Sequence, residues 1–205
     1  MAIQLYTPRK GRPSRIDLIE KRIEFGQGVL NLAVKVYKDC QDLRRRKCND
    51  AVEGVIRDIG QLMGMGGQFK NGCLYREKKL LEEYKKGQPK QICEHAIPVA
   101  ELRKRYLDNC ELNFVKLSLC PIVRISEDAN RKLDEAKRTK SGYQKGLPLS
   151  RYQGLGIELV THNGEDIDPA TWTDEDHWKL IKDTAANAPE LAEIIKHFKI
   201  FEGVG

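Results

Sequence analysis

Residues 90–137 read KQICEHAIPVAELRKRYLDNCELNFVKLSLCPIVRISEDANRKLDEAK. The stretch opens with a short run of β-forming residues at 91–93, which predicts a strand. This run stops at an acidic residue followed by a histidine, Glu94 and His95, and Pro98 follows three residues later. Because the pair stands where a strand is expected to end, it is the first candidate for chemistry in the chain.

The second half of the stretch predicts a helical insert and then a strand that leads directly into a helix. Apolar residues at helical spacing favour a helix over 99–108, and the β-branched run at 121–125 favours a second strand. Ser126 is a typical N-cap residue, and Glu127 and Asp128 suit the first turn of a helix. The predicted order is therefore strand, acid–histidine pair, helical insert, strand and helix.

The pattern of apolar residues in the rest of the chain favours mostly helices. Residues 16–63 carry apolar side chains at intervals of three and four, and Gly26 and Gly28 are expected to break or kink this pattern into two helices. A further helix is predicted over 74–85. Residues 150–160 are expected to end in a strand, followed by a hairpin turn and two helices.

Length and composition limit the class of protein. At 205 residues the chain can form one sizeable core, or one core with a helical appendage. No run approaches the roughly 18 apolar residues of a membrane span, and no signal-peptide pattern is present, so a cytoplasmic protein without membrane contact is expected. The six cysteines include no C-x-x-C pair, which favours reduced thiols over a zinc ribbon.

Charge is unevenly distributed along the chain. Residues 1–47 carry 12 Lys and Arg against 5 Asp and Glu, whereas residues 161–205 carry 4 against 10. This asymmetry favours a basic face for a polyanion and an acidic end with another role, although most charge runs are simply solvated surface. The segment at 10–13, Lys-Gly-Arg-Pro, resembles an AT-hook. The candidate nucleic-acid contacts in this region are Arg9, Lys10, Arg12, Arg15, Arg44, Arg45, Arg46 and Lys47.

The central stretch resembles metal-dependent nucleases of the HNH (ββα-metal) type that bear an E-H-x-x-P motif. The resemblance implies that His95 is the general base and that Glu94 is the first ligand of a divalent cation, Mg²⁺ or Mn²⁺. It implies Asn130 as the ligand from the helix, with Asp128 as the second candidate. Arg124 and Arg131, which bracket the helix start, are the candidates for holding the phosphate.

Three features depart from the family pattern. The acid is Glu94 where Asp or His is commoner, and the long gap from His95 to Asn130 requires the helical insert to loop out between the strands. The family has a central Asn that orients the loop, and the only candidate counterpart in this chain is Asn113. As an isolated pair, Glu94 and His95 would also fit an ordinary surface pair at a strand end.

The sequence thus predicts an α+β protein with an N-terminal helical region, a small ββα-metal-type centre, an additional β-hairpin and C-terminal helices. Its expected parts are a basic tail at 1–15, a helical region at 16–72, the nuclease-like centre at 73–160 and an acidic helical part at 161–205. No Walker A, G-x-G-x-x-G or G-x-S-x-G pattern occurs, which argues against P-loop, dinucleotide-binding and serine-hydrolase chemistry.

The expected function is metal-dependent DNA cleavage by a restriction-like, homing-like or phage-encoded endonuclease, acting in the cytoplasm or in that of a host. Because one ββα site cuts one strand, a homodimer would account for double-strand cleavage. The alternative is a non-catalytic DNA-binding protein that uses the basic N-terminal helices and tail. A third hypothesis is an assembly protein whose acidic C-terminal end docks a basic partner.

Overall fold

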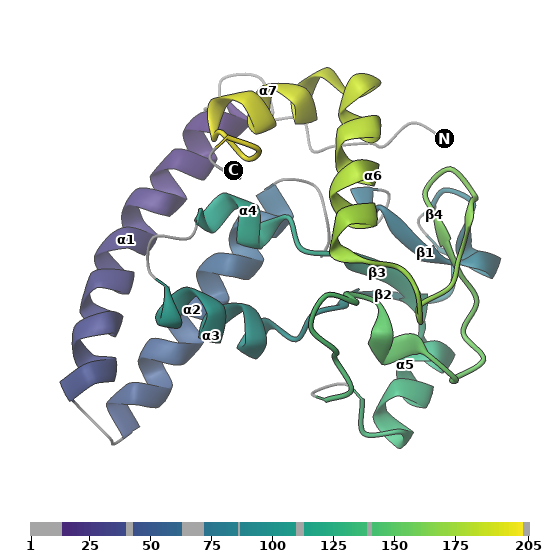
Figure 1. Ribbon diagram of the computed structural model, residues 1–205, viewed down its shortest axis with the longest axis horizontal. Coiled ribbons are helices and arrows are strands. Elements are labelled where there is room, and N and C mark those ends of the chain that lie inside the picture. The colour runs from purple at the N-terminus through teal and green to yellow at the C-terminus, as the bar shows by residue number, and fades with distance from the viewer. Residues whose placement is uncertain are drawn as a thin grey trace.

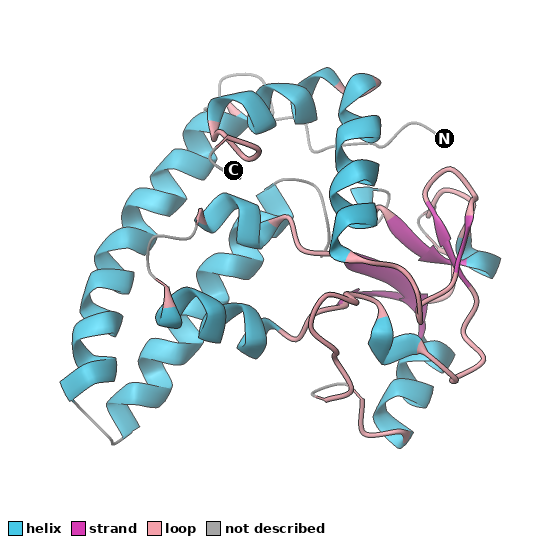
Figure 2. Cartoon of the chain, in the orientation of Figure 1, coloured by secondary structure: helices cyan, strands magenta, loops and turns pink. Residues whose placement is uncertain are grey.

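The computed structural model describes residues 14–39, 43–62, 72–85, 87–109, 113–138 and 141–202. Within these residues the protein is a mixed α+β structure of seven α-helices and one five-stranded sheet (Figures 1 and 2). The helices are α1 (Arg15–Asp39), α2 (Leu43–Leu62), α3 (Val99–Asp108), α4 (Phe114–Ser118), α5 (Glu127–Glu135), α6 (Asp174–Ala186) and α7 (Pro189–His197). The strands are β1 (Tyr75–Glu77), β2 (Gln91–His95), β3 (Ile122–Ser126), β4 (Leu159–Thr161) and β5 (Asp166–Ile167).

The long helices α1 and α2 pack side by side at one end of the molecule, and the sheet lies at the other (Figure 1). Helix α6 leads from the sheet toward α7, which lies across α1. The predicted break of the first helix at Gly26 and Gly28 is wrong, because α1 is continuous through both. A β-carbon at Gly26 would lie 2.8 Å from Val55 Cγ1 of α2, so this glycine permits close packing of the two helices.

The helix predicted over 74–85 is also absent, and this region forms β1 and a short 3-10 turn, η2 (Lys78–Leu80). All three residues of β1 are buried, and the strand pairs in parallel with β3 and antiparallel with β4. Pairing on both sides at the centre of the sheet therefore overrides the local helical preference of a charged segment.

The sheet has the strand order β2-β3-β1-β4-β5. Strands β2 and β3 are antiparallel neighbours, with His95 opposite Ile122 and Gln91 opposite Ser126. The Ser126 hydroxyl accepts a hydrogen bond from Ala129 N at 3.2 Å and thereby caps α5 as predicted. The predicted strand, helical insert, strand and helix therefore all occur, with α3 and α4 forming the insert.

A buried polar cluster joins β1 to the C-terminal helices. The Tyr75 hydroxyl lies 2.7 Å from His177 Nδ1, and Trp172 Nε1 donates to the same hydroxyl at 3.2 Å. His177 Nε2 lies 2.8 Å from the Leu119 carbonyl oxygen, which can only accept, so Nε2 carries the proton and Nδ1 accepts from Tyr75. This arrangement holds the His177 ring neutral, and burial lowers its pKa to about 4.

We expect the neutral His177 ring to make folding stability depend on pH. An unfolded histidine titrates near 6.5, so between about pH 6.5 and pH 4 the unfolded chain takes up a proton that the buried ring does not. The contribution of His177 is fully present above pH 6.5 and falls by about 3 kcal/mol as the pH drops through this window. Urea unfolding of the wild type and of His177→Gln at pH 7 and pH 5 measures this dependence of the free energy of unfolding on pH.

The variant should lose less stability than the wild type between these two pH values. Burial also lowers the pKa of His95 to about 4, so a smaller dependence on pH should remain in the variant. An unchanged dependence on pH in His177→Gln would contradict the assignment of the neutral ring.

Candidate functional site

Glu94 and His95 form the last two residues of β2, and both side chains are half-buried. The chain leaves the sheet immediately afterwards, where Ala96 N donates to the Pro121 carbonyl oxygen at 2.9 Å. Successive strand residues point to opposite faces of a sheet, so these two side chains do not extend in one direction. The pair nevertheless stands at a strand end with access to solvent, as the sequence predicts.

A buried arginine holds this strand end in place. The Arg151 side chain, from the short helix η3 (Ser150–Tyr152), is fully buried, and its Nη2 donates to Glu94 Oε1 at 3.0 Å. Its Nη1 donates to the carbonyl oxygens of His95 at 2.7 Å and Ala96 at 3.3 Å. Its Nε donates to the Arg138 carbonyl oxygen at 2.5 Å. One guanidinium thus connects the end of β2 to the segment that follows α5.

The electrostatic surroundings of the pair are predominantly positive. Burial lowers the pKa of His95 to about 4, and the guanidinium groups of Arg57 and Arg151 act in the same direction. Burial raises the pKa of Glu94, the charge of Arg151 opposes this, and the carboxylate of Asp134 adds a smaller increase. At neutral pH the site therefore presents an uncharged imidazole close to two cations.

The two ends of helix α5 lie near different parts of β2. Its first turn lies beside the start of β2, where Lys90 pairs with Glu127 at 3.1 Å. Asp128 belongs to this first turn and pairs with Arg131 at 2.5 Å, whereas His95 is the last residue of β2. The end of α5 carries Asp134, the electrostatic neighbour of Glu94.

Asn130 lies one turn before Asp134, and its Nδ2 donates to Asp134 Oδ2 at 3.3 Å. The two residues therefore share one face of α5, and Asp134 connects this face electrostatically to Glu94. Asp134 was not among the candidate ligands predicted from the sequence, because the candidates from the helix all lie in its first turns. The signal available was its spacing, four residues after Asn130.

The two arginines predicted to hold a phosphate, Arg124 and Arg131, lie in different surroundings. Arg124 is fully buried in β3, and its guanidinium donates to the carbonyl oxygens of Leu80 and Glu82. Arg131 is exposed and pairs with Asp128 and, at 3.6 Å, with Glu135.

Arg57 of α2, which the sequence did not single out, acts electrostatically on both Glu94 and His95. Its side chain is half exposed, and Glu53 pairs with it at 3.5 Å and with Arg103 of α3 at 2.6 Å. The next turn of α2 contacts the strand partner of His95, because a β-carbon at Gly60 would lie 3.7 Å from Ile122 Cδ1. Packing of α2 on the start of β3 therefore brings Arg57 toward the site.

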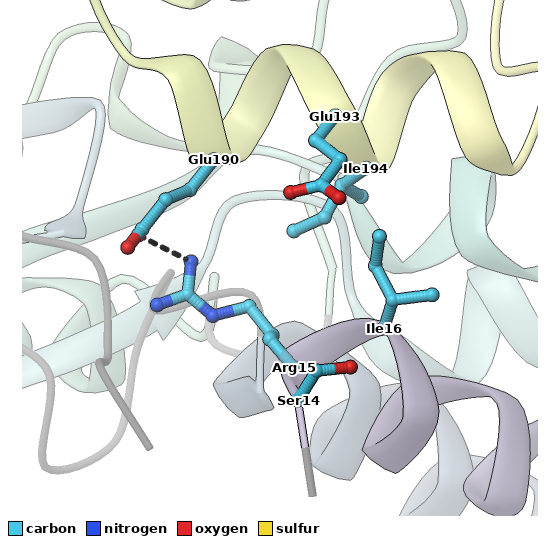
Figure 3. A pocket seen from close by; sticks show the side chains of 6 residues that line it. All are labelled: Ser14, Arg15, Ile16, Glu190, Glu193 and Ile194. Carbon is cyan, nitrogen blue, oxygen red and sulfur yellow. Dashed lines mark ion pairs between the residues drawn. The ribbon is translucent and has the colours of Figure 1, made fainter. Parts of the chain in front are cut away.

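The predicted nucleic-acid contacts of the N-terminal region are only partly described. Arg9, Lys10 and Arg12 lie outside the described residues, and so do the side chains of Arg44, Arg45, Arg46 and Lys47. Arg15 is described, and its side chain is 6% exposed and pairs with Glu190 of α7 at 3.1 Å. It lines a pocket of about 210 Å³ between α1 and α7 with Glu193 and Ile194 (Figure 3). Arg15 thus connects two helices.

Asn113, the stand-in for the loop-orienting residue, caps α4. Its side-chain oxygen accepts from Lys116 N at 3.1 Å, and its Nδ2 donates to the Phe198 carbonyl oxygen at 2.8 Å. Among the described residues, no three His, Cys, Asp or Glu side chains form a ready-made metal-binding group. In the same part of the chain, no helix is long and apolar enough to cross a membrane.

Comparisons of the chain with protein-family models, with curated proteins and with solved structures found no match.

Replacement of Arg151 tests the arrangement of this strand end. Arg151→Met keeps an unbranched side chain but leaves the half-buried Glu94 carboxylate and three carbonyl oxygens without this donor. Breaking a buried pair on one side costs about 3–5 kcal/mol, so the free energy of unfolding should fall by about this amount. Urea unfolding at pH 7 measures the change.

Arg131→Met is the matched control, because Arg131 also forms ion pairs but with a side chain that is 67% exposed. This control should leave the free energy of unfolding nearly unchanged. Equal effects of the two substitutions would show that Arg151 does not anchor the end of β2.

Proposed function

We propose that this protein is a divalent-metal-dependent DNA endonuclease whose reaction centre lies at Glu94 and His95. The observation that carries the proposal is a neutral imidazole at a strand end, beside a carboxylate and two arginines. A phosphodiester is an anion that needs both a proton acceptor for the attacking water and neutralisation of developing charge. The residues around the end of β2 are of the types that meet both needs.

His95 is the proposed general base. Its low pKa keeps the ring unprotonated at neutral pH, so it is ready to accept a proton. A bound phosphodiester brings negative charge next to Arg57 and Arg151 and offsets the effect of these cations on the ring. The pKa of His95 then rises toward the range in which an imidazole removes a proton from water efficiently.

Glu94, Asn130 and Asp134 offer the donor set that suits Mg²⁺ or Mn²⁺. Glu94 accepts a hydrogen bond from Arg151 through Oε1, and Asn130 and Asp134 share one face of α5. All three are hard oxygen donors, as these cations prefer. Asp128 is left out of this set because it pairs with Arg131 at the other end of α5. A bound cation would neutralise charge on the leaving oxygen.

Arg57 is the proposed phosphate-binding residue. Its side chain is half exposed, and its partner Glu53 is shared with Arg103, so the guanidinium retains donors for an anion. Arg124 is occupied by backbone carbonyl groups, which makes Arg57 the better candidate among the described arginines.

A nicking assay tests the proposal. Supercoiled plasmid and genomic DNA are incubated at low salt with Mg²⁺, Mn²⁺ or EDTA, and conversion to nicked or cut product is quantified. We expect metal-dependent cleavage that His95→Ala reduces by roughly 10²–10⁴-fold, the usual contribution of a general base. Asn130→Ala should reduce cleavage at limiting metal concentration. Asp128→Ala, on the same helix, is the matched control and should cleave like the wild type.

Cleavage that survives His95→Ala, or that EDTA leaves unchanged, would contradict the proposed centre. If no DNA is cut but binding persists and weakens steeply with salt, the chain is a non-catalytic DNA-binding protein. If the protein binds no DNA at any salt concentration, the remaining hypothesis is an assembly protein whose acidic C-terminal part docks a basic partner.

A further inference from the structure

Two thiols that are distant in sequence meet at the sheet. The sulfur atoms of Cys73 and Cys93 lie 3.6 Å apart, although 20 residues separate the two cysteines. Cys93 is part of β2, whereas Cys73 lies two residues before the start of β1, and β3 lies between these two strands in the sheet. The contact is therefore made across the intervening strand and results from the tertiary fold.

The two thiols differ in accessibility. Cys73 is completely buried, whereas Cys93 is half-buried. The Cys73 thiol donates a hydrogen bond to the Cys93 sulfur, so the two atoms already point toward each other. A disulfide requires the two sulfur atoms to approach by about 1.5 Å and, because β3 separates β2 from β1, the two backbone segments to move closer as well. A partly exposed cysteine beside a second cysteine is an arrangement that suits reversible thiol oxidation.

We propose that Cys73 and Cys93 are a redox modification site, at which a hydroperoxide converts the two thiols into an intramolecular disulfide. The site is independent of the proposed nuclease activity, because it rests only on the placement of the two sulfur atoms. The bond would tie the segment before β1 covalently to β2, one residue from Glu94.

The reaction balances with one hydroperoxide molecule. The Cys93 sulfur attacks a peroxide oxygen, the O–O bond breaks, and the displaced oxygen leaves with the thiol proton, which produces a sulfenic acid. The Cys73 sulfur then attacks the sulfenic sulfur, the S–O bond breaks, and the oxygen leaves as water with the second thiol proton. The two sulfur atoms together give up two electrons, and hydrogen peroxide is reduced to two water molecules.

Cys120 provides the matched control. It is also a free and buried cysteine. If burial and composition alone governed oxidation, Cys73 and Cys120 would behave alike. If the contact with Cys93 governs it, only Cys73 is oxidised.

The test uses the full chain and peptide mapping. The protein is treated with graded hydrogen peroxide, remaining thiols are alkylated, and a tryptic digest is analysed by mass spectrometry without reduction. Cys73 and Cys93 fall in separate tryptic peptides, 71–76 and 91–103, and neither contains another cysteine. We expect a cross-linked species of these two peptides, lighter than their sum by two hydrogen atoms, that disappears after treatment with dithiothreitol. Cys120 should remain alkylated.

The variants separate the roles of the two sulfur atoms. Cys120→Ala should still form the cross-link, and Cys73→Ala should leave Cys93 as a sulfenic acid trapped by dimedone. The proposal is overturned if peptides 71–76 and 91–103 stay reduced while other cysteines oxidise, or if Cys93 becomes linked to a different cysteine. Because the wild-type digest decides the outcome, a variant that folds poorly does not affect it.

Discussion

The buried guanidinium of Arg151 is the interaction on which the end of β2 depends. It donates to the Glu94 carboxylate and to the carbonyl oxygens of His95, Ala96 and Arg138, and its side chain has no exposed surface. A buried cation is tolerated only when its donors are satisfied, and here backbone oxygens satisfy most of them. The same contacts fix the position of Glu94 and connect the strand end to the segment after α5. The structure of this strand end and the proposed chemistry therefore depend on the same residue.

Local signals in the sequence predicted several elements correctly. Ser126 caps α5 as expected, because a cap depends on residues only three positions away. Predictions failed where distant contacts decide the structure. Helix α1 continues through Gly26 because this glycine packs against Val55, and β1 forms because Tyr75 and its neighbours pair with strands far along the chain. Neither contact can be recognised from a short window.

The candidate site was predictable in its centre but not in its surroundings. The pair of Glu94 and His95 stood out because an acid and a histidine end a β-forming run. The surroundings of the arginines could not be predicted from the sequence. A sequence does not show that the guanidinium of Arg124 is buried against carbonyl groups, whereas that of Arg57 is half exposed. The sequence also did not show which acid of α5 acts on Glu94, and in the structure the carboxylate of Asp134 contributes to raising the pKa of Glu94.

The central claim is that a divalent cation binds beside His95, and the chain contains four histidines that can report on it. Mn²⁺ broadens the NMR signals of nearby protons, so titrating the protein with Mn²⁺ while observing the histidine ring resonances measures the location directly. We predict that the His95 signals broaden first and that those of His177, buried against Tyr75 and Leu119, stay sharp. The claim is contradicted if His95 stays sharp while His162 or His197 broadens.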